Sequence, residues 1–302
     1  MKEYDVVIIG GGPAGLTAGI YATRAGARTL IIEKAAVGGK ANLADVLENY
    51  MGTDGVSGQE LMMKSFEQAK KCGADFLYDE VKELDVDGKT VKTAGQTIKY
   101  RALVIAGGCY DRNTGIDAEK KYIGRGVSYC AVCDGMFFRN KTVVVAGGGN
   151  TAFKDALYLS NVAERVYLVH RRAAFRADKV LVDRAKSKEN VEFVTDAVVT
   201  GIDGDDVLRE ITVRKTDGTE KTIKTDGLFV ALGTIPETEY LKGRIALNDG
   251  GYIVTDERMR TDAEGIYAAG DVREKTLRQI VTASSDGAVA GEEAANFALS
   301  KI

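Results

Sequence analysis

Proline is nearly absent from this chain: only Pro13 and Pro236 occur among its 302 residues, which argues against a linker-rich organisation. An excess of basic charge is also missing, because 41 Lys and Arg residues face 44 Asp and Glu residues and the formal net charge is −3. Binding to nucleic acid or to an anionic membrane needs a basic surface. We therefore expect neither nucleic acid nor membrane as a partner.

Long hydrophobic runs are missing too. The opening stretch, MKEYDVVIIG, becomes strand-like within four residues, and its apolar part is shorter than a signal-peptide core or a membrane span. We therefore expect a cytoplasmic protein. A hydrophobic content of 45% and a charged content of 28% are typical of globular proteins, and 302 residues suffice for two compact domains.

Cysteine is scarce as well, but two of the four cysteines, Cys130 and Cys133, stand together in the stretch SYCAVCDGM. In a reducing compartment a CxxC pair indicates catalysis or metal binding rather than a structural disulfide. A structural zinc site needs four ligands. The chain has no second CxxC and only one histidine, His170, so we expect no metal site. Cys72 and Cys109 lack such spacing and are interpreted as small apolar fillers.

An electron relay is the interpretation of the pair that we favour. A relay needs two neighbouring thiols, a carboxylate that moves protons, and an oxidant or reductant nearby. Cys130 and Cys133 supply the thiols and Asp134 supplies a carboxylate. The third requirement is met if a flavin binds in the first domain. Asp134 can equally be a turn residue together with Gly135.

One strand–turn–helix–strand pattern is written twice in the sequence. In the first copy a strand leads through Gly10, Gly12 and Gly15 into a helix and a second strand ending at Glu33. The second copy is given by KTVVVAGGGNTAFKDALYLSNVAERVYLVHRR, which contains Gly147, Gly149 and Ala152 and has a strand ending at His170. The distance from the first glycine to the strand end is 33 − 10 = 23 residues in one copy and 170 − 147 = 23 in the other.

This pattern is the dinucleotide-binding fingerprint, in which glycines let a pyrophosphate approach the positive end of the helix. The residue at the end of the second strand then indicates the ligand. Glu33 can accept hydrogen bonds from ribose hydroxyls but repels a 2′-phosphate, which suits FAD or NAD. The second copy has Arg171, Arg172 and Arg176 there instead, and guanidinium groups match the 2′-phosphate of NADPH. The alternative for these arginines is a solvated charged face.

Each half of the chain also contains a hairpin signal followed by an apolar strand. Asp87-Gly88 and Asp217-Gly218 both lie between alternating runs, which is a strong short-range cue for a hairpin. After Gly233 no third unit begins. Short strands ending at Gly270 and Asp271 and a helix from about Thr282 are expected to return to the first sheet.

We therefore predict an α/β fold with two Rossmann-like dinucleotide-binding domains, each three-layered, with a parallel sheet and a small antiparallel meander. The second domain is inserted into the first. Residues 1–112 and 245–302 are expected to form the discontinuous FAD-binding domain, and residues 113–244 the NADPH-binding domain with the CxxC pair. Two short links, near 113–117 and 239–244, would connect them and can act as a hinge.

Almost the whole chain resembles the low-molecular-weight, NADPH-dependent thioredoxin reductases. The resemblance rests on the motifs GGGPAG, ENY, GRGVSYCAVCDG, GGGNTA, HRRAAFRA, AAGDV and RQIVTAS followed after Ser285 by DG. It implies a homodimer with FAD in the first domain, NADPH in the second, and thioredoxin as the protein substrate. It also implies that Cys133 receives electrons from the flavin, that Cys130 attacks the thioredoxin disulfide, and that Asp134 protonates the departing thiolate. In this family the second domain rotates between the two half-reactions.

The resemblance also assigns the cofactor-binding positions. Those for FAD are Gly10, Gly12, Pro13, Ala14, Gly15, Glu33, Lys34, Gly38, Gly39, Lys40, Asn49, Val81, Gly108, Asp271, Arg278, Gln279 and Ile280. Those for NADPH are Gly147, Gly149, Asn150, Thr151, Arg171, Arg172 and Arg176.

Five positions depart from the family pattern. Lys40 stands where Gln is usual, Met51 where Pro is usual, and Gly107 where Thr is usual. Lys154 replaces an acidic residue, and Ala173 replaces a residue that is often acidic. Lys40 and Gly107 concern the flavin pocket, whereas the last two changes make the NADPH end more positive.

Two rival functions remain open at this point. One is a flavin-dependent reductase of another partner, such as a peroxiredoxin-linked or glutaredoxin-like protein, or one with another electron donor. The other is a sensor flavoprotein whose CxxC pair reports redox state without turnover.

Overall fold

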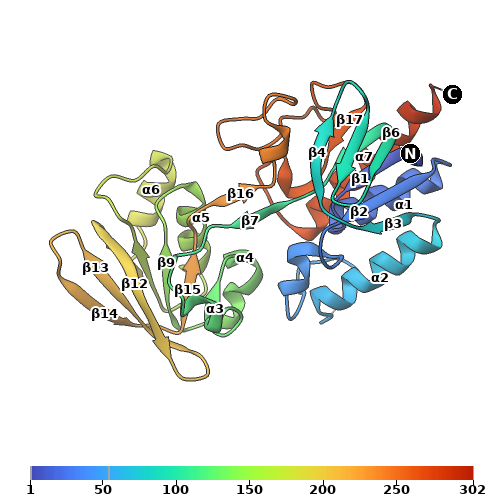
Figure 1. Cartoon of the computed structure of the whole chain (residues 1–302). Helices are drawn as coiled ribbons and strands as arrows, with labels where there is room; N and C mark the ends of the chain where they lie inside the picture. Colours follow the sequence, from blue (N-terminus) through green and yellow to red (C-terminus); the bar gives the residue numbers. More distant parts are fainter. Residues whose placement is uncertain (1, 54, 302) are drawn as a thin grey trace. The chain divides into compact units, whose positions relative to one another are not determined.

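The computed structural model describes residues 2–53 and 55–301, and these divide into two compact units (Figure 1). The first unit contains the described residues up to Tyr110 and those from Ile235 onward, and the second runs from Asp111 to Thr234. The chain crosses between the units twice. The crossings pair with each other as a two-stranded ribbon of β7 (Cys109–Asp111) and β16 (Thr234–Pro236).

Residues 235–244, which the sequence assigns to the second domain, lie in the first unit of the structure. The reason is burial. Leu241, in the short helix η3 (Glu239–Leu241), is fully buried in an apolar cluster of the first unit with Leu84 and Ile253.

The first unit is built on a seven-stranded sheet with the strand order β3-β2-β1-β6-β5-β4, and β17 pairs with β6. The pairs of β1 with β2 and β6, of β2 with β3, and of β6 with β17 are parallel, and β4, β5 and β6 form an antiparallel meander. The strands are β1 (Lys2–Ile9), β2 (Thr29–Glu33), β3 (Asp75–Tyr78), β4 (Val81–Asp85), β5 (Thr90–Thr93), β6 (Thr97–Ile105) and β17 (Ile266–Ala268). The hairpin predicted at Asp87-Gly88 is confirmed by the antiparallel pairing of β4 with β5.

Both faces of this sheet are covered, as the alternation along β1 shows. Val6 and Ile8 belong to one apolar cluster, and Val7 and Ile9 belong to another on the opposite face. The first face carries α1 (Pro13–Arg24), α2 (Gly58–Lys71) and α7 (Ile280–Leu299). Among the remaining elements are the short helices η1 (Gly39–Leu43) and η4 (Gly270–Val272).

Helices α1 and α7 lie side by side (Figure 1). Glycine makes this close approach possible, because a Cβ atom at Gly287 would overlap the backbone of Ala14 and one at Gly291 would overlap the backbone of Ala18. Helix α7 begins at Ile280, slightly earlier than the predicted start near Thr282. The reason is a reciprocal cap, in which the Gln279 side chain and the Thr282 side chain each bond to the other's backbone.

The second unit contains a five-stranded parallel sheet with the order β11-β10-β9-β15-β8 and a separate antiparallel sheet with the order β12-β13-β14. The strands are β8 (Val127–Ser128), β9 (Thr142–Ala146), β10 (Arg165–Val169), β11 (Val191–Val194), β12 (Ala197–Gly204), β13 (Leu208–Lys215), β14 (Glu220–Lys224) and β15 (Gly227–Val230). The hairpin predicted at Asp217-Gly218 is confirmed, because it joins β13 to β14.

The second unit also has three layers. Val143 and Val145 face a helical layer, whereas Val144 and Ala146 face the antiparallel sheet. The helices are α3 (Glu119–Tyr122), α4 (Ala131–Asp134), η2 (Gly135–Phe138), α5 (Asn150–Leu159) and α6 (Lys179–Lys186). The predicted α/β class, with parallel sheets and antiparallel meanders, is therefore confirmed. Among the described residues, no helix is long and apolar enough to cross a membrane.

Candidate functional site

The first glycine turn of the fingerprint joins β1 to α1. Gly10 has a positive φ of 105°, and a Cβ atom there would overlap the carbonyl oxygen of Ala106, so only glycine fits. Gly12 is the N-cap of α1 and makes no side-chain cap, and a Cβ there would come only within 4.0 Å of the Gly38 oxygen. The amino end of α1, which begins at Pro13, is thus open to an anionic ligand.

Glu33 lies beside this turn and is held in place by backbone amides. The amide of Gly11 donates a hydrogen bond to Glu33 Oε2 over 2.6 Å, and the amide of Ala35 donates to Oε1 over 2.8 Å. A carboxylate oxygen accepts more than one hydrogen bond. Both oxygens therefore keep acceptor capacity for ribose hydroxyls next to the glycine turn.

Gly38 and Gly39 lie on the other side of the turn. The amide of Gly38 donates to the carbonyl of Gly11 over 2.7 Å, and an added Cβ on Gly39 would lie 3.9 Å from the Cα of Gly12. Lys40 follows in η1 and is exposed. The predicted residues of this group, Gly10, Gly12 to Gly15, Glu33 and Gly38 to Lys40, are thus brought together.

The turn that precedes α7 in the chain lies next to the start of α1. Gly270 has a positive φ of 79°, and a Cβ there would lie 2.8 Å from the Cβ of Ala14 at the start of α1. The next residue, Asp271, has a buried Oδ1 atom without a hydrogen-bond partner among the described residues. Burial raises the pKa of Asp271, whereas the charges of Lys275 and Lys40 act in the opposite direction.

Arg278 provides a second buried polar atom of this kind, because its Nε also lacks a hydrogen-bond partner in residues 2–53 and 55–301. Its guanidinium stacks over Tyr252 at 4.3 Å from the ring centre. Nearby, Asn49 Nδ2 donates to Gln279 Oε1 over 3.1 Å. A buried acceptor and a buried donor near the amino ends of α1 and α7 fit a polar organic ligand that supplies the missing hydrogen bonds.

The remaining predicted positions of the first unit lie at its strand ends. Val81 starts β4 and is half-buried, and Gly108 follows β6 with a positive φ of 73°. Lys34 makes a bidentate ion pair with Glu237, at 2.6 and 2.7 Å from the two carboxylate oxygens. The structure therefore gives Lys34 a protein partner.

The second glycine turn joins β9 to α5 and repeats the geometry of the first. A Cβ at Gly147 would overlap the carbonyl oxygen of Ala231, whereas one at Gly149 would meet nothing within 4 Å. Gly149 is the N-cap of α5 and makes no side-chain cap. Asn150 and Asp178 exchange hydrogen bonds of 3.0 and 2.8 Å, and Thr151 is exposed in the first turn.

The three predicted arginines follow β10 beside this turn. The amide of Arg176 donates to the carbonyl of Gly148 over 2.9 Å, which holds the arginine segment against the glycines. Arg171, Arg172 and Arg176 are exposed, and no ion pair with a carboxylate occupies them within the part of the chain that the structure describes. Burial lowers the pKa of His170, and the charges of the three arginines lower it further. This end of the sheet is therefore strongly positive.

The CxxC pair forms a disulfide between Cys130 and Cys133, with Cys130 as the N-cap of α4 and Cys133 inside that single turn. The amide of Cys133 donates to Cys130 Sγ over 3.2 Å. Asp134 ends the turn, and its Oδ2 accepts a hydrogen bond of 2.5 Å from Ser128 Oγ. Two neighbouring sulfurs and a carboxylate thus form one local group.

A buried carboxylate contacts the residue that directly precedes the disulfide. Glu119 is only 2% exposed, and it accepts hydrogen bonds from the hydroxyl of Tyr129 and from the amide and hydroxyl of Thr114. Burial, followed by the bond to Glu119, raises the pKa of Tyr129. Because Tyr129 directly precedes Cys130, Glu119 fixes the segment that leads into the disulfide.

Sequence reasoning missed Ser128, Glu119 and Asp286 as parts of these sites. Asp286 accepts from the amide of Gly270 over 3.0 Å and from Lys275 Nζ over 2.7 Å, so it holds the turn that carries Asp271. Ser128 lies within the motif GRGVSYCAVCDG, Asp286 is the Asp of the DG that follows Ser285, and Glu119 lies outside the quoted motifs. The motifs do not indicate the contacts of these residues, because only the folded chain creates them.

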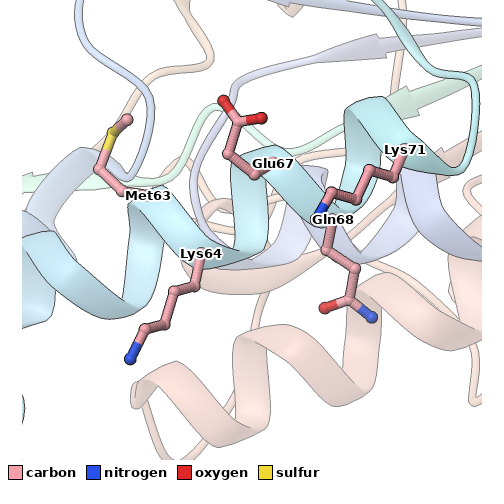
Figure 2. A pocket seen from close by; sticks show the side chains of 5 residues that line it. All are labelled: Met63, Lys64, Glu67, Gln68 and Lys71. Atoms are coloured by element: carbon pink, nitrogen blue, oxygen red, sulfur yellow. The ribbon is translucent and has the colours of Figure 1, made fainter.

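The hollow on α2 shown in Figure 2 belongs neither to the two glycine turns nor to the disulfide site. It is lined by Met63, Lys64, Glu67, Gln68 and Lys71, which all lie on this one helix. None of them is a predicted site residue.

Comparison with known proteins agrees with this geometry. The profile of the family described as pyridine nucleotide-disulphide oxidoreductase matches residues 4–287. The chain belongs to this family and is an oxidoreductase.

More specific similarity is to proteins named thioredoxin reductase. The one from Listeria monocytogenes is 46% identical, with 98% of this chain and 94% of that protein covered. The one from Bacillus subtilis is 45% identical, with 98% and 95% covered. The crystal structure of thioredoxin reductase from Streptococcus pyogenes superposes with a TM-score of 0.93 at 40% identity, and 99% of each chain is covered.

Proposed function

We propose that this chain is a thioredoxin-disulfide reductase in which electrons pass from NADPH to FAD, then to the Cys130–Cys133 disulfide, and finally to oxidised thioredoxin. The observation that carries the proposal is the disulfide itself, formed by two cysteines three positions apart and followed directly by a carboxylate. The similarity to proteins named thioredoxin reductase over nearly the whole chain supports it.

The first unit is proposed to bind FAD. The open amino end of α1 suits the pyrophosphate, Glu33 suits the ribose hydroxyls, and the buried Oδ1 of Asp271 suits a hydroxyl donor of the ribityl chain. Bound FAD would supply two-electron chemistry by taking a hydride from NADPH and reducing a disulfide. The positive ends of α1 and α7 then act as fixed charges near the cofactor.

The second unit is proposed to bind NADPH. Its glycine turn offers the open amino end of α5 to the pyrophosphate, and Arg171, Arg172 and Arg176 are free of carboxylate partners in the described chain and suit the 2′-phosphate. This proposal assigns the cofactor of each unit. It keeps the predicted rotation of the second unit between half-reactions as a prediction.

The dithiol is proposed to work as a relay. Cys133 would accept the electron pair at its sulfur, and the disulfide bond would break to leave two reduced sulfurs. The thiolate of Cys130 would then attack the thioredoxin disulfide, and Asp134 would give its proton to the departing thiolate. In the second exchange Cys133 would attack Cys130, which restores the internal disulfide and releases reduced thioredoxin. Each turnover consumes one NADPH and one proton.

Three further expectations complete the proposal. Thioredoxin is the expected protein substrate, and the predicted homodimer and cytoplasmic location remain predictions. The family membership favours an enzyme over a redox sensor without turnover, because members of an oxidoreductase family catalyse electron transfer.

The substitution Cys130→Ser tests the relay. It should abolish reduction of thioredoxin by NADPH but leave NADPH bleaching of the flavin intact, because only the outward-acting sulfur is lost. Cys72→Ser is the matched control, since Cys72 is a free cysteine of the first unit outside both proposed sites. Thioredoxin turnover that survives in Cys130→Ser would overturn the proposed function.

A further inference from the structure

Ser128 makes a short hydrogen bond to the carboxylate that follows the disulfide. It is the last residue of β8, it is 5% exposed, and its Oγ lies 2.5 Å from Asp134 Oδ2. A distance of this size is typical of a hydroxyl bonded to an ionised carboxylate. An ionised carboxylate can only accept, so the hydroxyl of Ser128 donates.

A second hydrogen bond fixes the position of that hydroxyl. The amide of Cys130 donates to Ser128 Oγ over 3.1 Å, and the amide of Asp134 donates to the Cys130 carbonyl over 3.1 Å. The Cys130 carbonyl lies 3.4 Å from Ser128 Oγ and is the weaker acceptor for the single hydroxyl proton. Ser128 therefore bonds to both ends of the segment that contains the disulfide.

We propose that Ser128 is a positioning residue of the dithiol site, and that its hydroxyl holds the carboxylate of Asp134 beside the disulfide and stabilises the ionised carboxylate. The inference rests on the proposed function, because it concerns the residue that would protonate the departing thiolate. Ser128 acts through Asp134, to whose carboxylate its hydroxyl donates a hydrogen bond.

The chemical consequence concerns proton transfer. A donor that bonds to the ionised form of an acid stabilises that form and makes the acid stronger. In the step that breaks the thioredoxin disulfide, the electron pair of the broken bond goes to the departing sulfur, and the proton comes from the carboxyl of Asp134. Removal of the Ser128 hydroxyl should make Asp134 a weaker acid and leave its carboxyl less well oriented.

The pKa of Asp134 can be measured directly by carbon-13 NMR of the intact flavin-loaded protein with labelled aspartate side chains. In the disulfide form the two cysteines do not titrate, which leaves the carboxyl signal undisturbed by them. The signal of Asp134 is assigned by its loss in Asp134→Asn. The substitution leaves the other titratable residues of the neighbouring elements unchanged. These are Lys154, Asp155 and Tyr158 of α5, which packs against α4, Glu119 before β8, and Tyr129 directly after it.

The substitution Ser128→Ala should raise the pKa of Asp134 by about one unit, a roughly tenfold change in its ionisation equilibrium, because a hydrogen bond to a charged group is lost. Ser128→Thr keeps a hydroxyl and should restore the original pKa. The matched control is Ser160→Ala, which also removes a buried serine hydroxyl of the second unit but one that bonds to the carbonyl of Leu157.

An unchanged pKa of Asp134 in Ser128→Ala, or an equal shift in Ser160→Ala, would overturn the inference. If Ser128→Ala does not fold, Ser128→Gly serves as the second variant, because it also removes the hydroxyl, adds no titratable group, and should give a shift of the same sign. Failure of the proposed function looks different. If Asp134→Asn keeps full thioredoxin reduction, the acid role is wrong, whereas the pKa measurement still reports whether Ser128 acts on Asp134.

Discussion

Replacing Asp286 by Asn should strongly destabilise the first unit. The carboxylate of Asp286 is paired with Lys275 at 2.7 Å and with Arg273 at 3.4 Å, and the three side chains are only 11%, 7% and 14% exposed. The same carboxylate oxygen accepts from the amide of Gly270. Asn keeps the shape and an acceptor for that amide but removes the charge.

The expected magnitude follows from this burial. Removing one partner of a buried ion pair costs about 3–5 kcal/mol, because the other charge stays buried without compensation. The first unit has 110 + 68 = 178 residues. For a domain of that size 1 kcal/mol lowers the melting temperature by about 2–4 °C, so a loss near the lower limit corresponds to about 6–12 °C.

The assay is thermal unfolding of the flavin-loaded protein, followed by the release of flavin fluorescence. Glu60→Gln is the control, because the Glu60–Lys64 pair of the first unit is 51% and 68% exposed, and such pairs contribute at most about 1 kcal/mol. The double variant Asp286→Asn, Lys275→Met should recover part of the loss, since it removes one of the unpaired buried charges. A double variant no more stable than the single one would refute this reasoning.

The remaining predictions concern the second unit and the first glycine turn. Arg171→Ala should lower the ratio of kcat/KM for NADPH to kcat/KM for NADH about tenfold, because one charge-assisted hydrogen bond is lost. The control is Arg184→Ala, which removes an exposed arginine of α6. An unchanged ratio in Arg171→Ala would contradict the proposed phosphate site. Burial raises the pKa of Asp155 from 3.8 to about 7. The contribution of this group to the free energy of unfolding should therefore be greatest below pH 4 and fall by at most about 4 kcal/mol as the pH rises to about 7. Urea unfolding of Asp155→Asn should lack this part of the pH dependence, and an identical pH profile would contradict the assignment. Gly10→Ala should yield protein without bound flavin, which the absorption spectrum reports, since the new methyl group would overlap the Ala106 carbonyl; a variant that still holds a full equivalent of flavin would show that this turn is not needed for binding.

Local sequence signals predicted much of the fold. The hairpins at Asp87-Gly88 and Asp217-Gly218 and the two glycine turns depend on residues that are close together in the chain, and the pairing of β4 with β5 and of β13 with β14 confirms both hairpins. Helix α7 begins two residues before its predicted start near Thr282, because Gln279 and Thr282 form a reciprocal cap.

Contacts between residues distant in the chain could not be predicted in the same way. The bond from Gly270 to Asp286 spans sixteen residues, and β7 pairs with β16 across the whole second unit. Even the bond between Ser128 and Asp134 depends on how β8 leads into the α4 turn. Packing decides these contacts, and no periodicity in the sequence marks them.

The central claim, that Cys130–Cys133 takes up electrons from NADPH within this chain, is tested most directly by anaerobic titration of the flavin-loaded protein with NADPH. A flavin and a disulfide each accept two electrons, so the wild-type chain should consume about two equivalents of NADPH. Cys133→Ser cannot form the disulfide and should consume about one. Equal consumption of one equivalent by both proteins would contradict the account.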